Sequence, residues 1–150
     1  MYHRFVARRV RRIFAMISAG DWQPMVDGMA PSFTYRFHGE HALAGSRHTT
    51  GALRAWWERC FRLMPDPTFR VEEVLVTGPP WSTRVATVLT VTADLADGSR
   101  YENVVHQFVR MRWGRITEVR TLEDTLVLQR ALDRLAASGF AEAHAAPITD

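Results

Sequence analysis

The sequence contains no lysine and only one cysteine, and each shortage excludes a class of chemistry. All 19 basic residues are arginines, so no lysine can form a Schiff base or act as a general base. Because Cys60 stands alone, the chain can form neither an internal disulfide nor a cysteine-rich zinc site. The P-loop, the dinucleotide fingerprint, G-x-S-x-G and H-E-x-x-H are also missing.

Long apolar runs are absent as well. No stretch approaches the roughly 18 uncharged apolar residues typical of a membrane span. Residues 1–14 interleave charged and apolar side chains instead of forming the apolar block of a secretory signal. We therefore expect no membrane partner and a cytoplasmic location.

The composition that remains suits one globular domain. A chain of 150 residues, 47% of them apolar, can bury a core without metals or disulfides. We expect a single domain over 1–150, with a short alanine-rich tail at 140–150. The net charge is only +3, so the cluster Arg8, Arg9, Arg11 and Arg12 predicts a solvated helix face and no nucleic-acid partner.

Apolar residues spaced by three and four predict helices at both ends and near the middle of the chain. The first helix covers about 3–18 and is broken by Gly20, after which Asp21 can cap a short second helix. A third helix starts after Thr49 or Thr50 and stops before Pro65. The last helix opens at Asp124 or Thr125 and ends near Gly139.

Between the third and last helices the apolar period changes from 3.6 to 2, which predicts strands. They are expected at about 68–77, 82–94, 100–113 and 115–122, with a further extended segment at 32–38 and a polar loop at 39–50. Helices followed by a meander of long strands indicate an α+β fold. If the antiparallel sheet curls, the helices leave a cavity on its concave side.

The stretch 101–124 carries the strongest candidate site. Tyr101, Asn103 and Gln107 share one face of the predicted strand, together with large apolar residues. This mixture favours a ligand oxygen bound in a pocket, although contacts to the backbone or to a second subunit would also satisfy these groups. His106 lies on the opposite face, which we interpret mainly as an interface, with a titrating base as the alternative.

Asp124 at the start of the last helix is the candidate catalytic residue, because burial in an apolar pocket raises a carboxyl pKa toward the working range. The simpler interpretation is a helix N-cap, a position that strongly prefers aspartate. Glu123 is expected on the opposite side and exposed.

Other candidates come from the third helix and the first strand. Trp56 and Trp57 could form the wall of a pocket, although aromatic residues at helical spacing more often belong to a core. On the first strand His38 could lie at the pocket mouth, and Arg36 could hold an anionic ligand if it faces inward. His38 and His41 form an H-x-x-H without a third ligand, so we expect no metal site, and no cofactor is indicated.

With these elements in place, the chain resembles the NTF2-like superfamily, in particular its SnoaL-like and ketosteroid-isomerase-like branch. The resemblance covers most of the chain, from Arg4 to about Gly139. It rests on the G-D-W turn at 20–22, FTYRFHGEHALAG at 33–45, TGALRAWWERCFRLMPD at 50–66, YENVVHQFVRMRWGRI at 101–116 and the Asp124-Thr125 pair.

The resemblance implies a cone-shaped, strongly bent antiparallel sheet whose helices enclose a hydrophobic pocket, and usually a homodimer joined through the sheets. In isomerases of this group, a carboxylate moves a proton beside a carbonyl. SnoaL-like cyclases place an acid near the start of the last helix, here Asp124. The isomerase base aligns with Arg36 or His38 and its carboxyl donor with Gln107; none of these is a carboxylate, which argues against steroid isomerase chemistry.

Three functions stay open from the sequence. The first is a cofactor-free isomerase, cyclase or dehydratase acting beside a carbonyl of a cyclic or polyketide-like substrate, with Asp124 moving the proton. The second is a non-catalytic module for a hydrophobic ligand or for dimerisation. The third is an epoxide hydrolase, which would need a second inward carboxylate. A fold of this kind does not choose among them.

Overall fold

A computed structural model describes all 150 residues and shows an α+β fold built on one six-stranded sheet. The helices are α1 (Tyr2–Ser18), α2 (Gln23–Asp27), α3 (Thr50–Leu63) and α4 (Thr125–Ala137), with a short 3-10 helix η1 (Ala141–His144). The strands are β1 (Met29–Phe37), β2 (Gly45–Arg47), β3 (Thr68–Thr77), β4 (Thr83–Asp94), β5 (Arg100–Arg112) and β6 (Arg115–Glu123).

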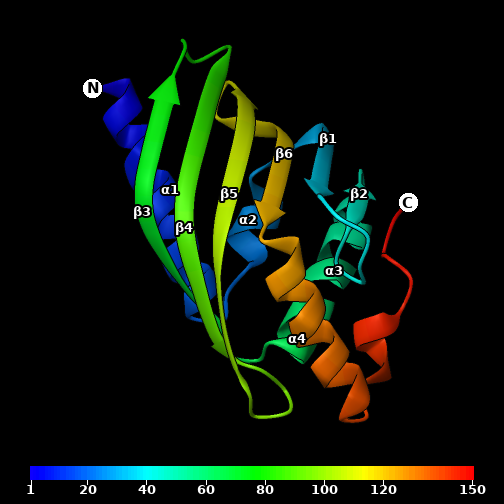
Figure 1. Cartoon of the computed structure of the whole chain (residues 1–150). Coiled ribbons are helices and arrows are strands. Elements are labelled where there is room, and N and C mark those ends of the chain that lie inside the picture. Colours follow the sequence, from blue (N-terminus) through cyan, green and yellow to red (C-terminus); the bar gives the residue numbers. More distant parts are fainter.

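The strands lie in the order β2-β1-β6-β5-β4-β3 (Figure 1). The pairs β3–β4, β4–β5 and β5–β6 are antiparallel, as expected. β1 also pairs antiparallel with β2, a strand that was not predicted. The β1–β6 pair is parallel, which departs from the purely antiparallel sheet predicted above. The two strands are far apart in sequence, so no hairpin constrains their relative direction.

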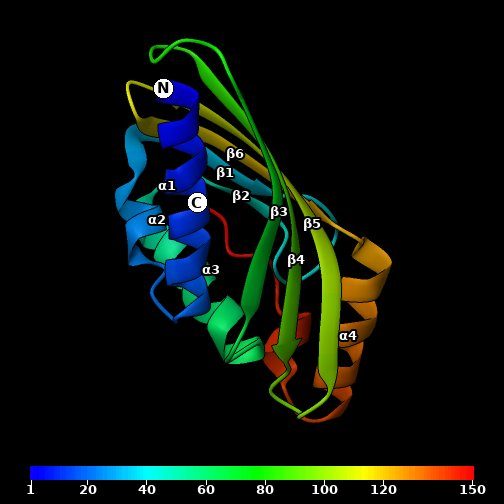
Figure 2. The same cartoon turned by 90° about the vertical axis from the view of Figure 1, so that its left-hand side faces the viewer.

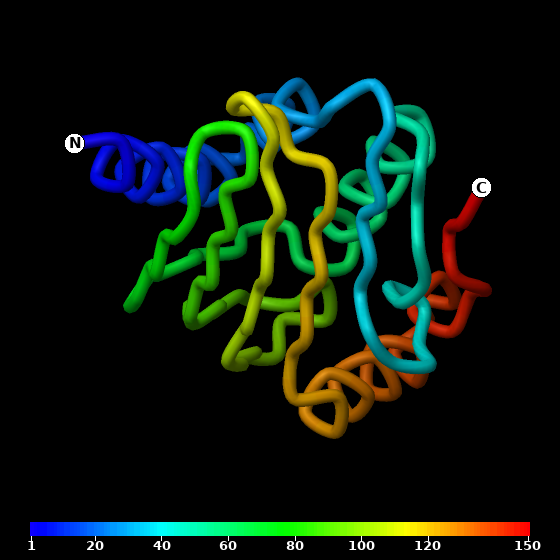
Figure 3. The backbone as a smooth tube through the Cα atoms, turned by 90° about the horizontal axis from the view of Figure 1, so that it is seen from above, coloured from blue at the N-terminus to red at the C-terminus, as the bar shows by residue number.

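The sheet is strongly bent and open, and α1, α2 and α3 lie on the same side of it (Figure 2). Register shifts between Val71 and Glu73 and between Arg110 and Met111 mark irregular pairing, which increases local twist and bending. Seen from above, β1 and β2 lie close to α3, while α1 lies nearest the β3 edge (Figure 3). The curved inner face and the helices together enclose the core.

Strand alternation decides which side chains enter that core. Every second residue of β4 and β5 is buried, beginning with Thr83 and Tyr101. The turn between β5 and β6 fixes the register of those two strands, because Trp113 and Gly114 both have positive φ, at 50° and 77°. Consecutive positive φ values suit the twist of a two-residue hairpin turn.

The helices are fixed by apolar stripes and caps, as their spacing predicts. Leu53, Trp56 and Trp57 of α3 are buried, and the Thr49 side chain accepts a hydrogen bond from Ala52 N at 3.2 Å. This confirms Thr49 as the cap of the third helix. None of the helices combines the length and the apolar character needed to cross a membrane.

The loop predicted at 39–50 and the tail are more ordered than expected. The loop contains β2 and the buried segment His41–Ala44. Arg47 is fully buried there. Its guanidinium carbon lies over the Trp56 ring, 5.0 Å from the ring centroid, and its Nη1 donates a hydrogen bond to Ile148 O at 2.8 Å. Asp150 accepts from His48 N and Thr49 N. Backbone carbonyls and one carboxylate therefore hold the tail on the α3 side.

Candidate functional site

A cavity of about 60 Å³ lies between α3 and the inner face of the sheet. Its wall is mainly aromatic and aliphatic, with Phe37, Trp56, Trp57 and Phe61 among the contributors. Four side chains bring polar groups to this wall from neighbouring strands: Tyr35 of β1, Gln107 of β5, and Thr121 and Glu123 of β6. A mostly apolar cavity with a few convergent polar groups is the usual form of a small-molecule site.

Glu123 is the only carboxylate in the wall of this cavity. It pairs with Val105 across the β5–β6 ladder and lies two residues beyond the buried Thr121, so both side chains point inward. The Tyr101 hydroxyl donates to Glu123 Oε2 at 2.8 Å. Asn103 Nδ2 in turn donates to Tyr101 Oη at 2.8 Å and to Asp124 O at 3.0 Å. Asn103 and Tyr101 thus fix the position of one Glu123 oxygen.

The surroundings of Glu123 raise the pKa of its carboxyl group toward neutral pH. Burial raises the pKa of Glu123 from 4.5 to about 7, and the hydrogen bond from Tyr101 opposes that rise. Burial and the nearby Glu123 carboxylate raise the pKa of Tyr101 well above its ordinary value. Tyr101 therefore remains a donor while Glu123 exchanges its proton near pH 7, which suits a general acid or base.

Several polar groups near the cavity have hydrogen-bonding capacity to spare. The buried Gln107 makes one side-chain hydrogen bond, from Nε2 to Thr121 Oγ1 at 3.1 Å, which leaves its Oε1 free. The buried Trp57 Nε1 has no hydrogen-bond partner. Buried polar groups are nearly always satisfied. These groups could therefore bind an oxygen-bearing ligand.

Tyr101, Asn103, Gln107 and Trp56 occupy the inner side of the fold, as the sequence suggested. Their contributions differ. Tyr101 and Asn103 form the hydrogen-bonded support of Glu123. Trp56 shapes the wall, but its Nε1 already donates to Leu43 O at 2.8 Å. The neighbouring Trp57 is the indole with a free N–H.

Asp124 does not reach the cavity. Its side chain is exposed and accepts from Leu126 N at 3.0 Å and Val127 N at 3.2 Å, so it serves as the N-cap of α4. The expectation that Glu123 lies outside and exposed is wrong. The predicted strand ended at 122, whereas β6 continues through Glu123 and keeps it on the inner face with Thr121 and Val119.

Arg36 and His38 also lie elsewhere than the pocket. Tyr35 and Phe37 of β1 are buried, so the intervening Arg36 points outward and is exposed. His38 lines a shallow depression on the outer face of the sheet, together with His106 and Phe108. Neither is placed to bind a ligand in the inner cavity.

His41 is buried and Cys60 is half-buried in the fold. His41 Nδ1 accepts from Leu43 N at 3.2 Å, so its Nε2 donates to His38 O at 3.1 Å. Burial lowers the pKa of His41 and raises the pKa of the Cys60 thiol, which keeps both groups neutral. No group of three or more potential ligands gathers around the histidines to hold a metal ion.

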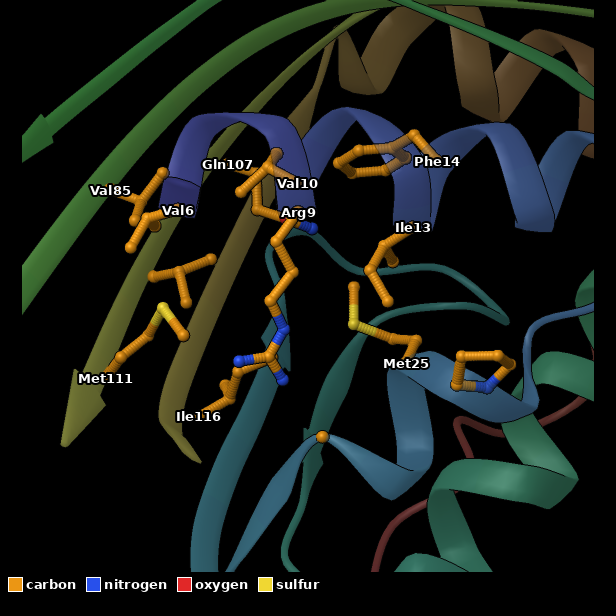
Figure 4. A pocket seen from close by; sticks show the side chains of 13 residues that line it. Val6, Arg9, Val10, Ile13, Phe14, Met25, Val85, Gln107, Met111 and Ile116 are labelled. Atoms are coloured by element: carbon orange, nitrogen blue, oxygen red, sulfur yellow. The ribbon is translucent and has the colours of Figure 1, made fainter. Parts of the chain in front are cut away.

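A second cavity, of about 40 Å³, lies beneath α1 (Figure 4). Its wall is formed mainly by Val6, Val10, Ile13 and Met25, with one charged residue, Arg9. Phe14 and Gln107 line both this cavity and the one that contains Glu123. Arg9 was predicted only as part of a solvated helix face, because periodicity does not show how far a long side chain folds back over an apolar surface.

Comparisons with known proteins agree with this architecture. PrhC from Penicillium brasilianum superposes with a TM-score of 0.81 at 15% identity, covering 95% of each chain. An NTF2-like protein from Burkholderia pseudomallei gives 0.74 at 16% identity, covering 83% of this chain and 95% of its own. A Jannaschia protein provisionally assigned as a SnoaL-like polyketide cyclase gives 0.63 at 21% identity, covering 83% and 89%. At these identities the likeness concerns the fold.

No curated protein sequence matches the chain significantly. The profile of the SnoaL-like domain matches residues 10–119, which is well over half of the chain. The resemblance inferred from the sequence is therefore confirmed. The chain belongs to the SnoaL-like family of the NTF2-like superfamily.

Proposed function

We propose that this protein is a cofactor-independent acid/base enzyme that isomerises, cyclises or dehydrates a small cyclic or polyketide-like substrate beside a carbonyl group. The observation that carries the proposal is the Glu123 carboxyl, held by Tyr101 in an apolar cavity where its pKa is about 7. A carboxyl group that titrates near the working pH can both take and return a proton.

In the proposed reaction, Glu123 removes a proton from the carbon next to the substrate carbonyl, and the carbonyl oxygen gains negative charge as an enolate. The unpartnered Trp57 Nε1 and the amide of Gln107 are the donors available to that oxygen. The protonated Glu123 then returns its proton to another carbon, or to a leaving hydroxyl in a dehydration. Protons and electrons balance without an external oxidant or reductant.

Glu123 replaces Asp124 in this role. Asp124 is engaged by two backbone amides of α4 and is exposed, whereas Glu123 faces the cavity. The epoxide hydrolase alternative needs two carboxylates in the cavity wall, and Glu123 is the only one there. A purely binding function is the remaining alternative. It predicts that wild type and a variant without the Glu123 carboxyl give the same reaction rate.

The test uses β,γ-cyclohexenone, a small ketone whose isomerisation to the conjugated enone is followed by ultraviolet absorbance. The wild-type protein is expected to accelerate this reaction, and Glu123→Gln should abolish the acceleration while the circular dichroism spectrum stays unchanged. The adjacent Asp124→Asn serves as the matched control and should retain the activity. Equal rates for wild type and Glu123→Gln would overturn the assignment.

We further propose that two copies associate through the outer face of the sheet. Val104, Phe108 and Leu122 are large apolar residues exposed there, 46–53% of their surface being accessible. They lie on the adjacent strands β5 and β6 with His106 and Arg120 between them. Apolar residues mixed with arginine and histidine suit an interface between subunits. Separately, we propose a cytoplasmic location for the protein.

A further inference from the structure

The two cavities share two lining side chains. Phe14 of α1 and Gln107 of β5 are the residues common to both walls, and Figure 4 shows both at the edge of the cavity beneath α1. The Phe14 ring changes position by rotation about its side-chain bonds, without a shift of the backbone. The Gln107 side chain is held by a single hydrogen bond, to Thr121. The joined site proposed below requires a rotamer change at Phe14, whose ring packs against Phe69 with the two ring centroids 5.8 Å apart.

The cavity beneath α1 also has an outer mouth. Arg9, Ile13, Pro24 and Gly28 line both this cavity and an open groove of about 580 Å³ on the surface. Figure 4 shows the Arg9 side chain descending from α1 toward Ile116, across the lining of the cavity. The linings thus follow one another from the groove, past Arg9 and the apolar cavity, to Gln107, which also lines the cavity that contains Glu123.

The charge at the mouth is positive and largely uncompensated. Arg9 is half-buried and its Nη1 donates to Gly114 O at 2.7 Å, but the residue forms no ion pair. Arg8 and Arg12 line the same groove and also lack ion pairs, while Asp27 is the only acidic residue there. A partly desolvated guanidinium with free N–H groups is well suited to bind a carboxylate or phosphate.

We propose that the two cavities form one elongated site for an amphipathic anion, with its apolar body in the cavities and its anionic group at Arg9. This inference names the ligand class of the proposed active site and rests on that proposal. It places the reacting carbonyl near Glu123, at the end of the ligand away from the charge. Arg9 is a binding residue in this account and takes no part in proton transfer.

The first test is binding of decanoate, measured by isothermal titration calorimetry below its critical micelle concentration, with decanol as the uncharged counterpart. Wild type should bind decanoate more tightly than decanol. Arg9→Gln should weaken decanoate binding by roughly tenfold, as expected for a lost charge-assisted contact, and leave decanol binding unchanged. Arg4→Gln is the matched control, because Arg4 is exposed on the same helix and absent from both walls.

Three results would overturn the anion site: no binding of decanoate by wild type, equal losses in the Arg9 and Arg4 variants, or a parallel loss of decanol binding in Arg9→Gln.

A second variant tests the joined cavities. Gln107→Phe should fill the passage, so that decanoate binding falls to the level of hexanoate while hexanoate binding stays the same. Decanoate binding that is unaffected by this substitution would show that the two cavities are separate sites.

Failure of this inference can be told apart from failure of the proposed activity. Glu123→Gln should bind decanoate as wild type does while losing the isomerisation of β,γ-cyclohexenone. If Glu123→Gln keeps that turnover, the acid/base proposal is refuted and the decanoate results still decide the anion site. If Arg9→Gln keeps its affinity for decanoate, the anion site is refuted and the turnover of the Glu123 variant still decides the activity.

Discussion

Replacing Glu123 by glutamine should change how the stability of the protein depends on pH. In the folded state burial raises the pKa of Glu123 from 4.5 to about 7. Between these two values the folded chain keeps a proton that the unfolded chain has released. The free energy of unfolding therefore contains a contribution from Glu123 that is fully present below about pH 4.5 and is lost as the pH rises through about 7.

The size of this contribution follows from the pKa difference. At about 1.4 kcal/mol per pH unit, raising the pKa from 4.5 to about 7 corresponds to about 3 kcal/mol. Glutamine is nearly isosteric, stays neutral at every pH and can still accept the hydrogen bond from Tyr101. Glu123→Gln should therefore match wild type near pH 4 and exceed it by about 3 kcal/mol near pH 8.

Urea unfolding at both pH values measures the difference directly, and subtracting the variant from wild type removes the contributions of other titrating groups. Glu102→Gln is the matched control, because Glu102 is exposed on the outer face of β5. It should leave the pH dependence as in wild type. Parallel pH dependences for wild type and Glu123→Gln would refute the conclusion that the half-buried Glu123 has a raised pKa.

Three further substitutions have defined outcomes. Tyr101→Phe removes a hydrogen bond that favours the Glu123 carboxylate, so the pKa of Glu123 should rise above about 7 and the pH–rate profile for β,γ-cyclohexenone should shift to higher pH; an unshifted profile would contradict this coupling. Asp124→Ala removes the α4 cap and should lower the free energy of unfolding in urea by about 1 kcal/mol while activity is retained; loss of activity without loss of stability would point to a direct role for Asp124. Phe108→Glu places a charge on the exposed outer face, and sedimentation should show conversion of a dimer to a monomer; a dimer that persists would place the interface elsewhere.

The long strands and the helix caps were predictable from the sequence because their signals are local. The span 68–77 was predicted and observed without change, and β4 and β5 agree within one residue at each end. Thr49 caps α3 as its residue type indicates. Periodic apolar residues, a change of period from 3.6 to 2 and turn residues such as Gly114 all act over a few neighbouring residues.

The carboxylate of the site was not predictable in the same way. Glu123 and Asp124 are adjacent, and their roles depend on whether β6 ends before or after Glu123. An error of one residue at a strand end reverses which side chain faces the pocket. The same difficulty applies to Arg36, whose direction depends on the register of β1 with β6. Tertiary pairing decides both cases.

The short strand β2 and the buried Arg47 depend on contacts between distant parts of the chain. β2 has three residues and pairs with the end of β1, and Arg47 is buried because carbonyls such as Ile148 O accept its hydrogen bonds. A polar, glycine-bearing sequence at 39–50 gives no local sign of such contacts.

The measurement that tests the central claim most directly is the titration of the Glu123 side-chain carboxyl carbon by nuclear magnetic resonance. Assignment by comparison with Glu123→Gln identifies the signal. The account predicts a midpoint near pH 7, and a higher midpoint in Tyr101→Phe. A midpoint near 4.5 in the folded wild-type protein would contradict it, because Glu123 would then be an ordinary solvated carboxylate and a weak base.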